Sequence, residues 1–167
     1  QWIEMGEAAI PELKQAIKSE NWRIRTHALL AMGKTGNQSL TPLVLDRLNN
    51  DDNTAVKNCA VMALGDLKET SAVPVLIELL TTDHTSAQKK TRPQQRVIVQ
   101  SLGKIGDSRA SAPLFELLLS TKTEQLRIEI ADALIAIKDP AISQLILAKT
   151  SNAKSDPKPN IGRLPYV

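Results

Sequence analysis

The chain has 167 residues, an apolar content of 42% and a formal net charge of +3. This is enough sequence for one folded domain, and no apolar run approaches the roughly 20 residues that a helix needs to span a bilayer. Residues 84–106 hold five basic side chains and no acidic one, so the positive charge is local and does not characterise the rest of the chain.

A pattern recurs along the chain with a period of 32 residues in its first half. Gly33 returns as Gly65 and Pro42 returns as Pro74, each after 32 residues. A fixed period of this length is typical of stacked supersecondary units, each of which buries its apolar face against the next. The pattern includes a basic residue followed three positions later by an apolar one: Arg25 with Ala28, Lys57 with Ala60, and Arg127 with Ile130.

Each repeat is predicted to begin with a helix that has a face of small residues. Positions i, i+4, i+7 and i+8 lie on one side of a helix, and small side chains there allow two helices to approach closely. Gly33, Gly65 and Gly103 follow the last apolar position. We expect them to end these helices, because glycine adopts positive φ without strain. The face consists of Ile24, Ala28, Ala31 and Met32 in one repeat and of Val56, Ala60, Ala63 and Leu64 in the next.

A second helix is predicted in each repeat, beginning near a proline, because proline suits the first turn of a helix. The step from Leu76 to Leu114 is 38 residues rather than 32, so residues 84–93 are predicted to form a polar, cationic insertion loop. Residues 151–167 contain three prolines and are predicted to form an extended tail or linker. The predicted second helices cover residues 11–18, 42–49, 74–81 and 112–120, with a degenerate last copy at 142–149.

Two stretches, residues 56–67 and 101–107, resemble the HEAT-like repeats of the phycobiliprotein-lyase class. In that class the pattern Val-Arg-x-x-Ala-x-x-Ala-Leu-Gly-x-Ile-Gly-Asp precedes a proline-led helix. The resemblance implies an all-α, right-handed α-α superhelix, a HEAT-like solenoid of about four and a half helix pairs over residues 1–150. It also implies a ladder between an aspartate before the first helix and the basic residue in its first turn, for which Asp51 with Lys57 fits best.

The N-terminal sequence lacks an initiator methionine, and residues 6–11 have the composition of a turn between two helices of a repeat. We therefore expect the sequence to be a fragment of a longer protein.

Residues suited to catalysis or metal binding are scarce. The chain has two histidines, His27 and His84, and one cysteine, Cys59. A nucleophile needs a base and a metal needs several ligands, so we predict no catalytic site, no metal and no cofactor. Cys59 is predicted to be a structural thiol and His27 a partly exposed helix residue. A single cysteine also favours a reducing compartment, so a cytoplasmic location is expected.

Two sets of charged residues are candidates for partner binding. The basic set could bind an acidic protein surface, but it is too short for a grip on duplex DNA, and aromatic residues for stacking on single strands are few. The acidic set lies on the second helices, which commonly line the concave face in the family, where it could bind a cationic peptide or helix. A solvated surface remains the alternative for both sets. The basic set is Lys89, Lys90, Arg92 and Arg96, and the acidic set is Asp46, Glu78 and Glu116.

The resemblance leaves the function open, since the same repeats serve lyase subunits, adaptors and DNA-repair proteins. We predict a non-catalytic scaffold for protein–protein interaction. The first alternative is a subunit of a bilin lyase or isomerase, which would bind an open-chain tetrapyrrole. The second is a HEAT-like DNA-binding repair protein, which would show a salt-sensitive affinity for DNA.

Overall fold

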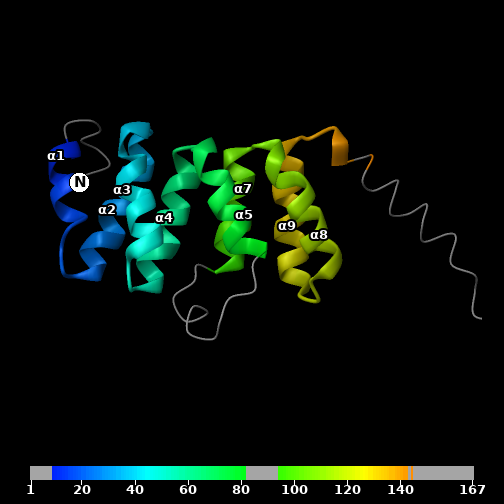
Figure 1. Ribbon diagram of the computed structural model, residues 1–167, viewed down its shortest axis with the longest axis horizontal. Coiled ribbons are helices and arrows are strands. Elements are labelled where there is room, and N and C mark those ends of the chain that lie inside the picture. Colours follow the sequence, from blue (N-terminus) through cyan, green and yellow to red (C-terminus); the bar gives the residue numbers. More distant parts are fainter. Residues whose placement is uncertain (1–8, 82–93, 143, 145–167) are drawn as a thin grey trace, which may run out of the picture.

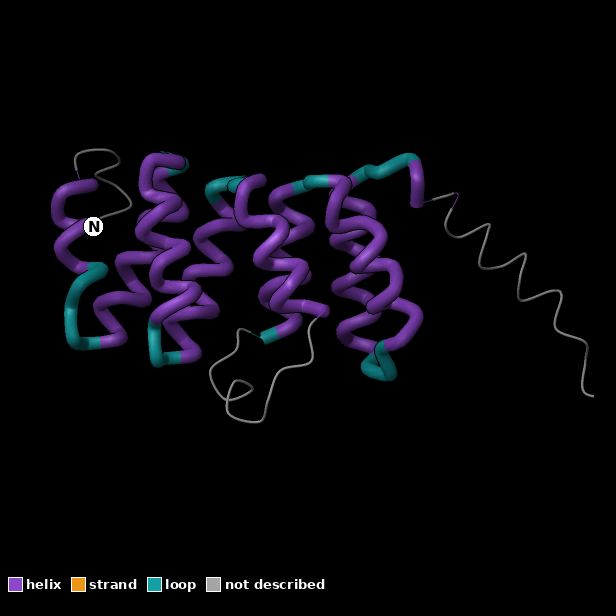
Figure 2. The backbone as a smooth tube through the Cα atoms, viewed as in Figure 1, coloured by secondary structure: helices purple, strands orange, loops and turns teal. Residues whose placement is uncertain are grey.

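The computed structural model describes residues 9–81, 94–142 and 144, and the elements among these residues are helices joined by turns, with no strand. Helix pairs stack along the long axis, from α1 at one end to α8 and α9 at the other (Figure 1). Short loops join the helices of a pair (Figure 2). The first helices of the repeats are α2 (Trp22–Thr35), α4 (Thr54–Asp66), α7 (Gln95–Ile105) and α9 (Glu124–Ile137). The second helices are α1 (Ile10–Ala16), α3 (Thr41–Asn50), α5 (Val73–Thr81) and α8 (Ser111–Ser120).

Local sequence signals set where these helices begin. The side chains of Asn21 and Asn53 accept hydrogen bonds from the backbone N–H groups of Arg23 (3.0 Å) and Ala55 (2.9 Å), which are among the donors that a helix start leaves without a partner. Pro42 lies in the first turn of α3, as predicted. A 3₁₀ turn precedes each of α3, α5 and α8, at Gln38–Leu40, Thr70–Ala72 and Ser108–Ala110.

The prediction that Gly33, Gly65 and Gly103 end the first helices is wrong. All three lie inside helices, and none has a positive φ. Their missing side chains serve packing instead. A Cβ added at Gly33 would lie 2.9 Å from the Cα of Ala63, and one added at Gly103 would lie 2.9 Å from the Cα of Ala133. Within the described ranges, the residues with positive φ are Gly36, Lys68, Gly106 and Lys138, which follow the first helices.

The face of small residues is buried as predicted, with one exception. Ala28, Ala60 and Ala63 are completely buried. Ile24 is 40% exposed, whereas the equivalent Val56 is buried. The difference arises because α2 is the earliest first helix that the structure describes, and no described helix of its layer precedes it.

The two layers differ in how closely neighbouring helices approach. Successive first helices contact one another along much of their length, whereas α5 and α8 contact each other at few positions. An open groove of about 580 Å³ separates α5 from α8. A stack that is closely packed in one layer and spread in the other is shorter on the closely packed side. We therefore infer that the first helices form the inner side, which corrects the expectation that the second helices line the concave face.

A buried ion pair joins two repeats, and its partners differ from those predicted. Asp51 pairs with Arg25 of the preceding first helix, through Nε to Oδ2 at 2.7 Å and Nη2 to Oδ1 at 2.8 Å. Lys57, the predicted partner, donates instead to the carbonyl oxygen of Asn49 (3.3 Å). Burial would raise the pKa of Asp51, but hydrogen bonds from Arg25 and from the N–H of Asn53 outweigh it and leave the pKa lowered.

Some predictions concern residues outside the described ranges. These are the insertion at 84–93, the tail at 151–167 and all of the predicted helix 142–149 except residues 142 and 144. His84, Lys89, Lys90 and Arg92 belong to the first of these segments.

Candidate functional site

The four first helices present equivalent positions on one exposed side, which we call the first-helix face. On α2 the face is formed by His27, Leu30 and Lys34, whereas Ala28 and Met32 point the opposite way and are buried. The equivalents of Leu30 on the next three helices are Met62, Gln100 and Asp132, and the equivalents of Lys34 are Asp66, Lys104 and Ala136.

One row of this face is a ladder of ion pairs between successive helices. The carboxylate of Asp66 lies 2.9 Å from the Nζ of Lys34 and 2.6 Å from the Nζ of Lys104, so three helices are linked through one residue. Burial acts to raise the pKa of Asp66, but the hydrogen bonds and charges of the two lysines lower it overall. Because both lysines are half exposed, we expect the ladder to fix the register of the helices more than it adds stability.

The middle row of the face changes in character along the stack. Leu30 is partly buried and Met62 is 38% exposed, whereas Gln100 and Asp132 are polar and exposed. A groove of about 270 Å³ lies between α7 and α9, lined by Gln100, Lys104, Glu129, Asp132 and other residues of the two helices. The middle row is therefore apolar over α2 and α4, with Leu30 and Met62, and polar over α7 and α9, with Gln100 and Asp132.

Cys59 and His27 lie at the edge of the first-helix face. Cys59 is partly buried, and burial raises the pKa of its thiol, so the thiol form is favoured. His27 is exposed, and its Nδ1 lies 2.6 Å from the carbonyl oxygen of Arg23, within the same helix.

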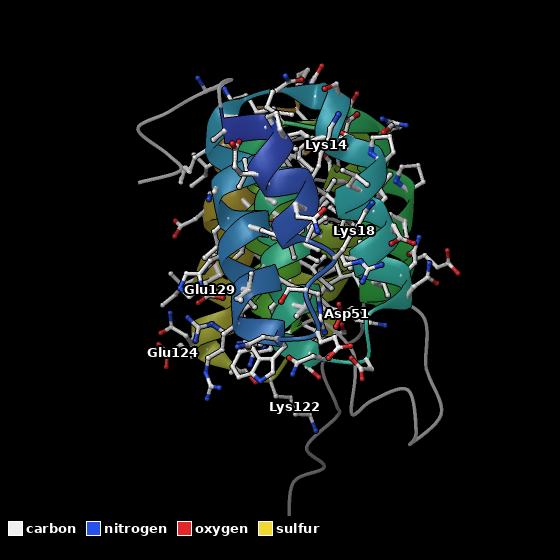
Figure 3. The ribbon with its side chains drawn as sticks, turned by 90° about the vertical axis from the view of Figure 1, so that its left-hand side faces the viewer. Lys14, Lys18, Asp51, Lys122, Glu124 and Glu129 are labelled. Carbon is white, nitrogen blue, oxygen red and sulfur yellow. The ribbon has the colours of Figure 1, made fainter. Side chains whose placement is uncertain are left out.

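Arg96, one of the predicted basic residues, belongs to α7 and not to the insertion loop. Its guanidinium pairs with Glu129 of α9, with Nε 2.7 Å from Oε1 and 3.0 Å from Oε2. Glu129 is buried, with 8% of its surface exposed. The hydrogen bond from Arg96 lowers the pKa of its carboxyl group. Viewed along the stack from the α1 end, Glu129 lies on one side of the molecule, apart from Lys14 and Lys18 (Figure 3). Arg96 therefore links two first helices.

The predicted acidic set lies on the second helices, on the outer side of the stack. Asp46 of α3 accepts hydrogen bonds from Arg47 and from the Nδ2 of Asn50 (2.8 Å). Glu78 of α5 is exposed, and Glu116 of α8 lines the groove between α5 and α8. The three carboxylates occupy equivalent positions, as predicted, but they do not face the inner side.

The first-helix face was not among the predicted sites, although the sequence carries a signal for it. The residue after each buried glycine is Lys34, Asp66 or Lys104, so its charge alternates from one repeat to the next. Among the described residues, no group of three or more His, Cys, Asp or Glu side chains is placed to hold a metal ion. No helix in the described ranges has the length and apolar character needed to cross a membrane.

A family model for HEAT repeats matches residues 10–91. Together with the stack of helix pairs, this match identifies the family. The chain is a HEAT-like repeat protein. Its all-α superhelix is similar to that of a chain in the complex of CpcE and CpcF of phycocyanin lyase from Nostoc sp. PCC7120, with a TM-score of 0.65 and 22% sequence identity.

The alignment with the lyase chain covers 90% of this HEAT-like repeat protein but 63% of the lyase chain. At this level of identity the similarity concerns the fold, and it places the repeats with those of the phycobiliprotein-lyase class in architecture. No curated protein matches the sequence.

Proposed function

We propose that this HEAT-like repeat protein is a binding subunit whose first-helix face holds a segment of another protein. The observation that carries the proposal is the backbone contact between first helices at Gly33, Gly65 and Gly103. Helices packed in this way present side chains from four repeats in fixed rows, and such rows on a stack of repeats form extended binding surfaces. The similarity to one chain of a two-chain complex supports a protein partner.

The rows also indicate what a partner would offer. Leu30 and Met62 would bury apolar side chains of the partner, and Met adapts to irregular apolar surfaces. Gln100 and Asp132 would accept hydrogen bonds from polar or cationic groups. A segment that is apolar at one end and polar or basic at the other fits this order.

The test is capture of partners from an extract of the source cells, with wild-type protein and two variants compared by quantitative mass spectrometry. Met62→Glu places a charge in the apolar part of the middle row, and Glu78→Lys changes the charge at an exposed position on the outer layer. We expect a protein retained by the wild type to be retained by Glu78→Lys and lost by Met62→Glu. Equal retention of that protein by both variants would mean that the first-helix face does not bind it, which would contradict the proposal.

A subunit of a bilin lyase is the second candidate function, and the similarity to a chain of phycocyanin lyase favours it. In this case the solenoid would hold an open-chain tetrapyrrole close to an acceptor protein. A shift in the visible absorption of a bilin on mixing with the purified protein, abolished by Met62→Glu, would support it. An unchanged spectrum at high protein concentration would argue against bilin binding and leave protein binding as the remaining candidate function.

A further inference from the structure

The ladder of ion pairs on the first-helix face stops before α9. The carboxylate of Asp66 on α4 bridges to Lys34 of α2 and to Lys104 of α7, so an ion pair spans each of these two gaps between neighbouring helices. The equivalent residue of α9 is Ala136, which is exposed and carries no charge. The side chain that would extend the ladder from α7 to α9 is therefore missing.

The groove of about 270 Å³ between α7 and α9 lies at this point. The buried Gly103 and Ala133 form its floor, and Ala136 lies on one wall. The two helices are held close together beneath it, because a Cβ at Gly103 would lie 2.9 Å from the Cα of Ala133. Pockets for small-molecule ligands usually measure about 300–1,000 Å³, so the size of this groove suits a single long side chain.

Three charged residues line the groove, and two of them already have a partner of opposite charge. The Nζ of Lys104 lies 2.6 Å from Asp66 of α4, which packs on α7 on the side away from α9 (Figure 1). Glu129 accepts hydrogen bonds from the Nε of Arg96. Asp132 is exposed and forms no hydrogen bond or ion pair with another described residue. The groove therefore has one carboxylate whose charge is not compensated.

We propose that this groove receives an arginine side chain of the segment bound to the first-helix face, an inference that rests on the proposed function and names one residue of the partner. The aliphatic part of the arginine lies on the floor of the groove. Its guanidinium donates hydrogen bonds to the carboxylate of Asp132 and to the side-chain oxygen of Gln100, which lines the opposite wall and also has no described partner. A guanidinium has five N–H donors in a planar fork, so it can bind both acceptors at once.

An acidic side chain fits this groove less well, although it could extend the ladder by pairing with Lys104. The ammonium group of Lys104 already has a carboxylate within 2.6 Å. An acidic side chain would also lie beside Glu129 and Asp132, and like charges across an interface disfavour association. The residues that line the groove carry two negative charges and one positive charge, so charge complementarity favours a cation.

The test uses the full chain and three small probes, the amides of N-acetyl-arginine, N-acetyl-citrulline and N-acetyl-glutamate. Citrulline has nearly the shape of arginine but no charge. In two-dimensional NMR spectra recorded at low salt, the backbone N–H signals of Gly103, Ala133 and Ala136 report on the groove. We expect the arginine probe to shift these signals with millimolar affinity and the citrulline probe to bind about threefold more weakly or less.

Substitutions at exposed positions separate the effect of the charge from that of the space. Asp132→Asn removes the uncompensated charge and should weaken binding of the arginine probe about threefold. Ala136→Leu fills the groove without changing the charge and should prevent the probe from entering. Glu78→Gln removes an exposed carboxylate on the outer layer and is the matched control, so the titration of this variant should equal that of the wild type.

Failure of the arginine probe to bind, equal binding of the citrulline probe, or binding unchanged by Asp132→Asn would overturn the proposal. Tighter binding of the glutamate probe would assign the groove to a carboxylate beside Lys104. Residues 145–167 contain one arginine, Arg163, and stronger binding of the arginine probe by Arg163→Gln would assign the groove to the chain's own C-terminal segment. The probes need no partner, so capture that depends on Met62 without arginine binding would reject the groove and leave the proposed function standing.

Discussion

Replacing Gly33 with alanine should destabilise the protein, although alanine is the better helix former. The added Cβ would lie 2.9 Å from the Cα of Ala63, 3.3 Å from its carbonyl oxygen and 3.3 Å from its Cβ. Two of these three atoms belong to the backbone of α4, so no change of rotamer relieves the contact. The two helices must move apart, and the adjacent buried side chains Leu29 and Met32 then lose contacts.

The expected magnitude follows from two opposing effects. Alanine in a helix interior is favoured over glycine by about 1 kcal/mol. Overpacking of a close contact costs about 1–3 kcal/mol. We therefore expect a net loss of about 1 kcal/mol in the free energy of unfolding for Gly33→Ala. In the double variant Gly33→Ala with Ala63→Gly, the 2.9 Å contact to the Cα remains, so the exchange should not restore stability.

Urea denaturation followed by circular dichroism measures this difference directly. Gly103→Ala is the matched variant, since its Cβ would lie 2.9 Å from the Cα of Ala133, and it should show a loss of the same sign. A stability gain of about 1 kcal/mol for either variant would mean that helix propensity acts without opposition. That result would refute the backbone contact and, with it, the closely packed inner layer.

Other substitutions test single contacts. Ala60→Leu, at a completely buried position, should reduce the free energy of unfolding by about 1–3 kcal/mol, and unchanged thermal unfolding would contradict the packing of this face. Asp51→Asn should cost about 3 kcal/mol at neutral pH, because it leaves Arg25 buried without its carboxylate. The lowered pKa of Asp51 means that its contribution is complete above about pH 3.9, the unfolded pKa, and is lost as the pH falls through the lower folded value. The free energy of unfolding of Asp51→Asn should therefore depend less steeply on pH below about pH 4 than that of the wild type. An equal pH dependence would contradict the ion pair. Arg96→Ser should lower the midpoint of thermal unfolding more than Lys89→Ser, because Arg96 forms an ion pair with Glu129. Equal midpoints would mean that this ion pair does not contribute to stability and that Arg96 is available for partner binding only. Cys59→Ala should retain both fold and partner binding, whereas loss of binding with intact folding would make the thiol functional.

The helix pairs could be predicted from the sequence because their signals are local. Apolar spacing of three and four residues, an asparagine before a helix and a proline in its first turn each act within a few residues. The role of Gly33 could not be predicted in the same way. A helix end and a close contact both require the absence of a side chain, and only the position of Ala63 in the neighbouring helix distinguishes them.

The contacts between repeats could not be predicted in the same way, because they depend on how the repeats stack. Asp51 was paired with Lys57 of its own repeat, but stacking places Arg25 of the previous repeat within 2.7 Å of it. The acidic set on the second helices was expected on the concave side. The small residues of the first helices bring the opposite layer together instead, so the inner surface carries Leu30 and Met62.

The central claim is that a partner protein lies on the first-helix face. A photo-crosslinking amino acid placed at exposed Gln100 on that face, and in a second variant at exposed Glu78 on the outer layer, tests it within the intact complex. The account predicts that illumination joins the partner to the variant labelled at position 100 and not to the one labelled at position 78. Crosslinks from position 78 alone would contradict it and would place recognition on the second helices.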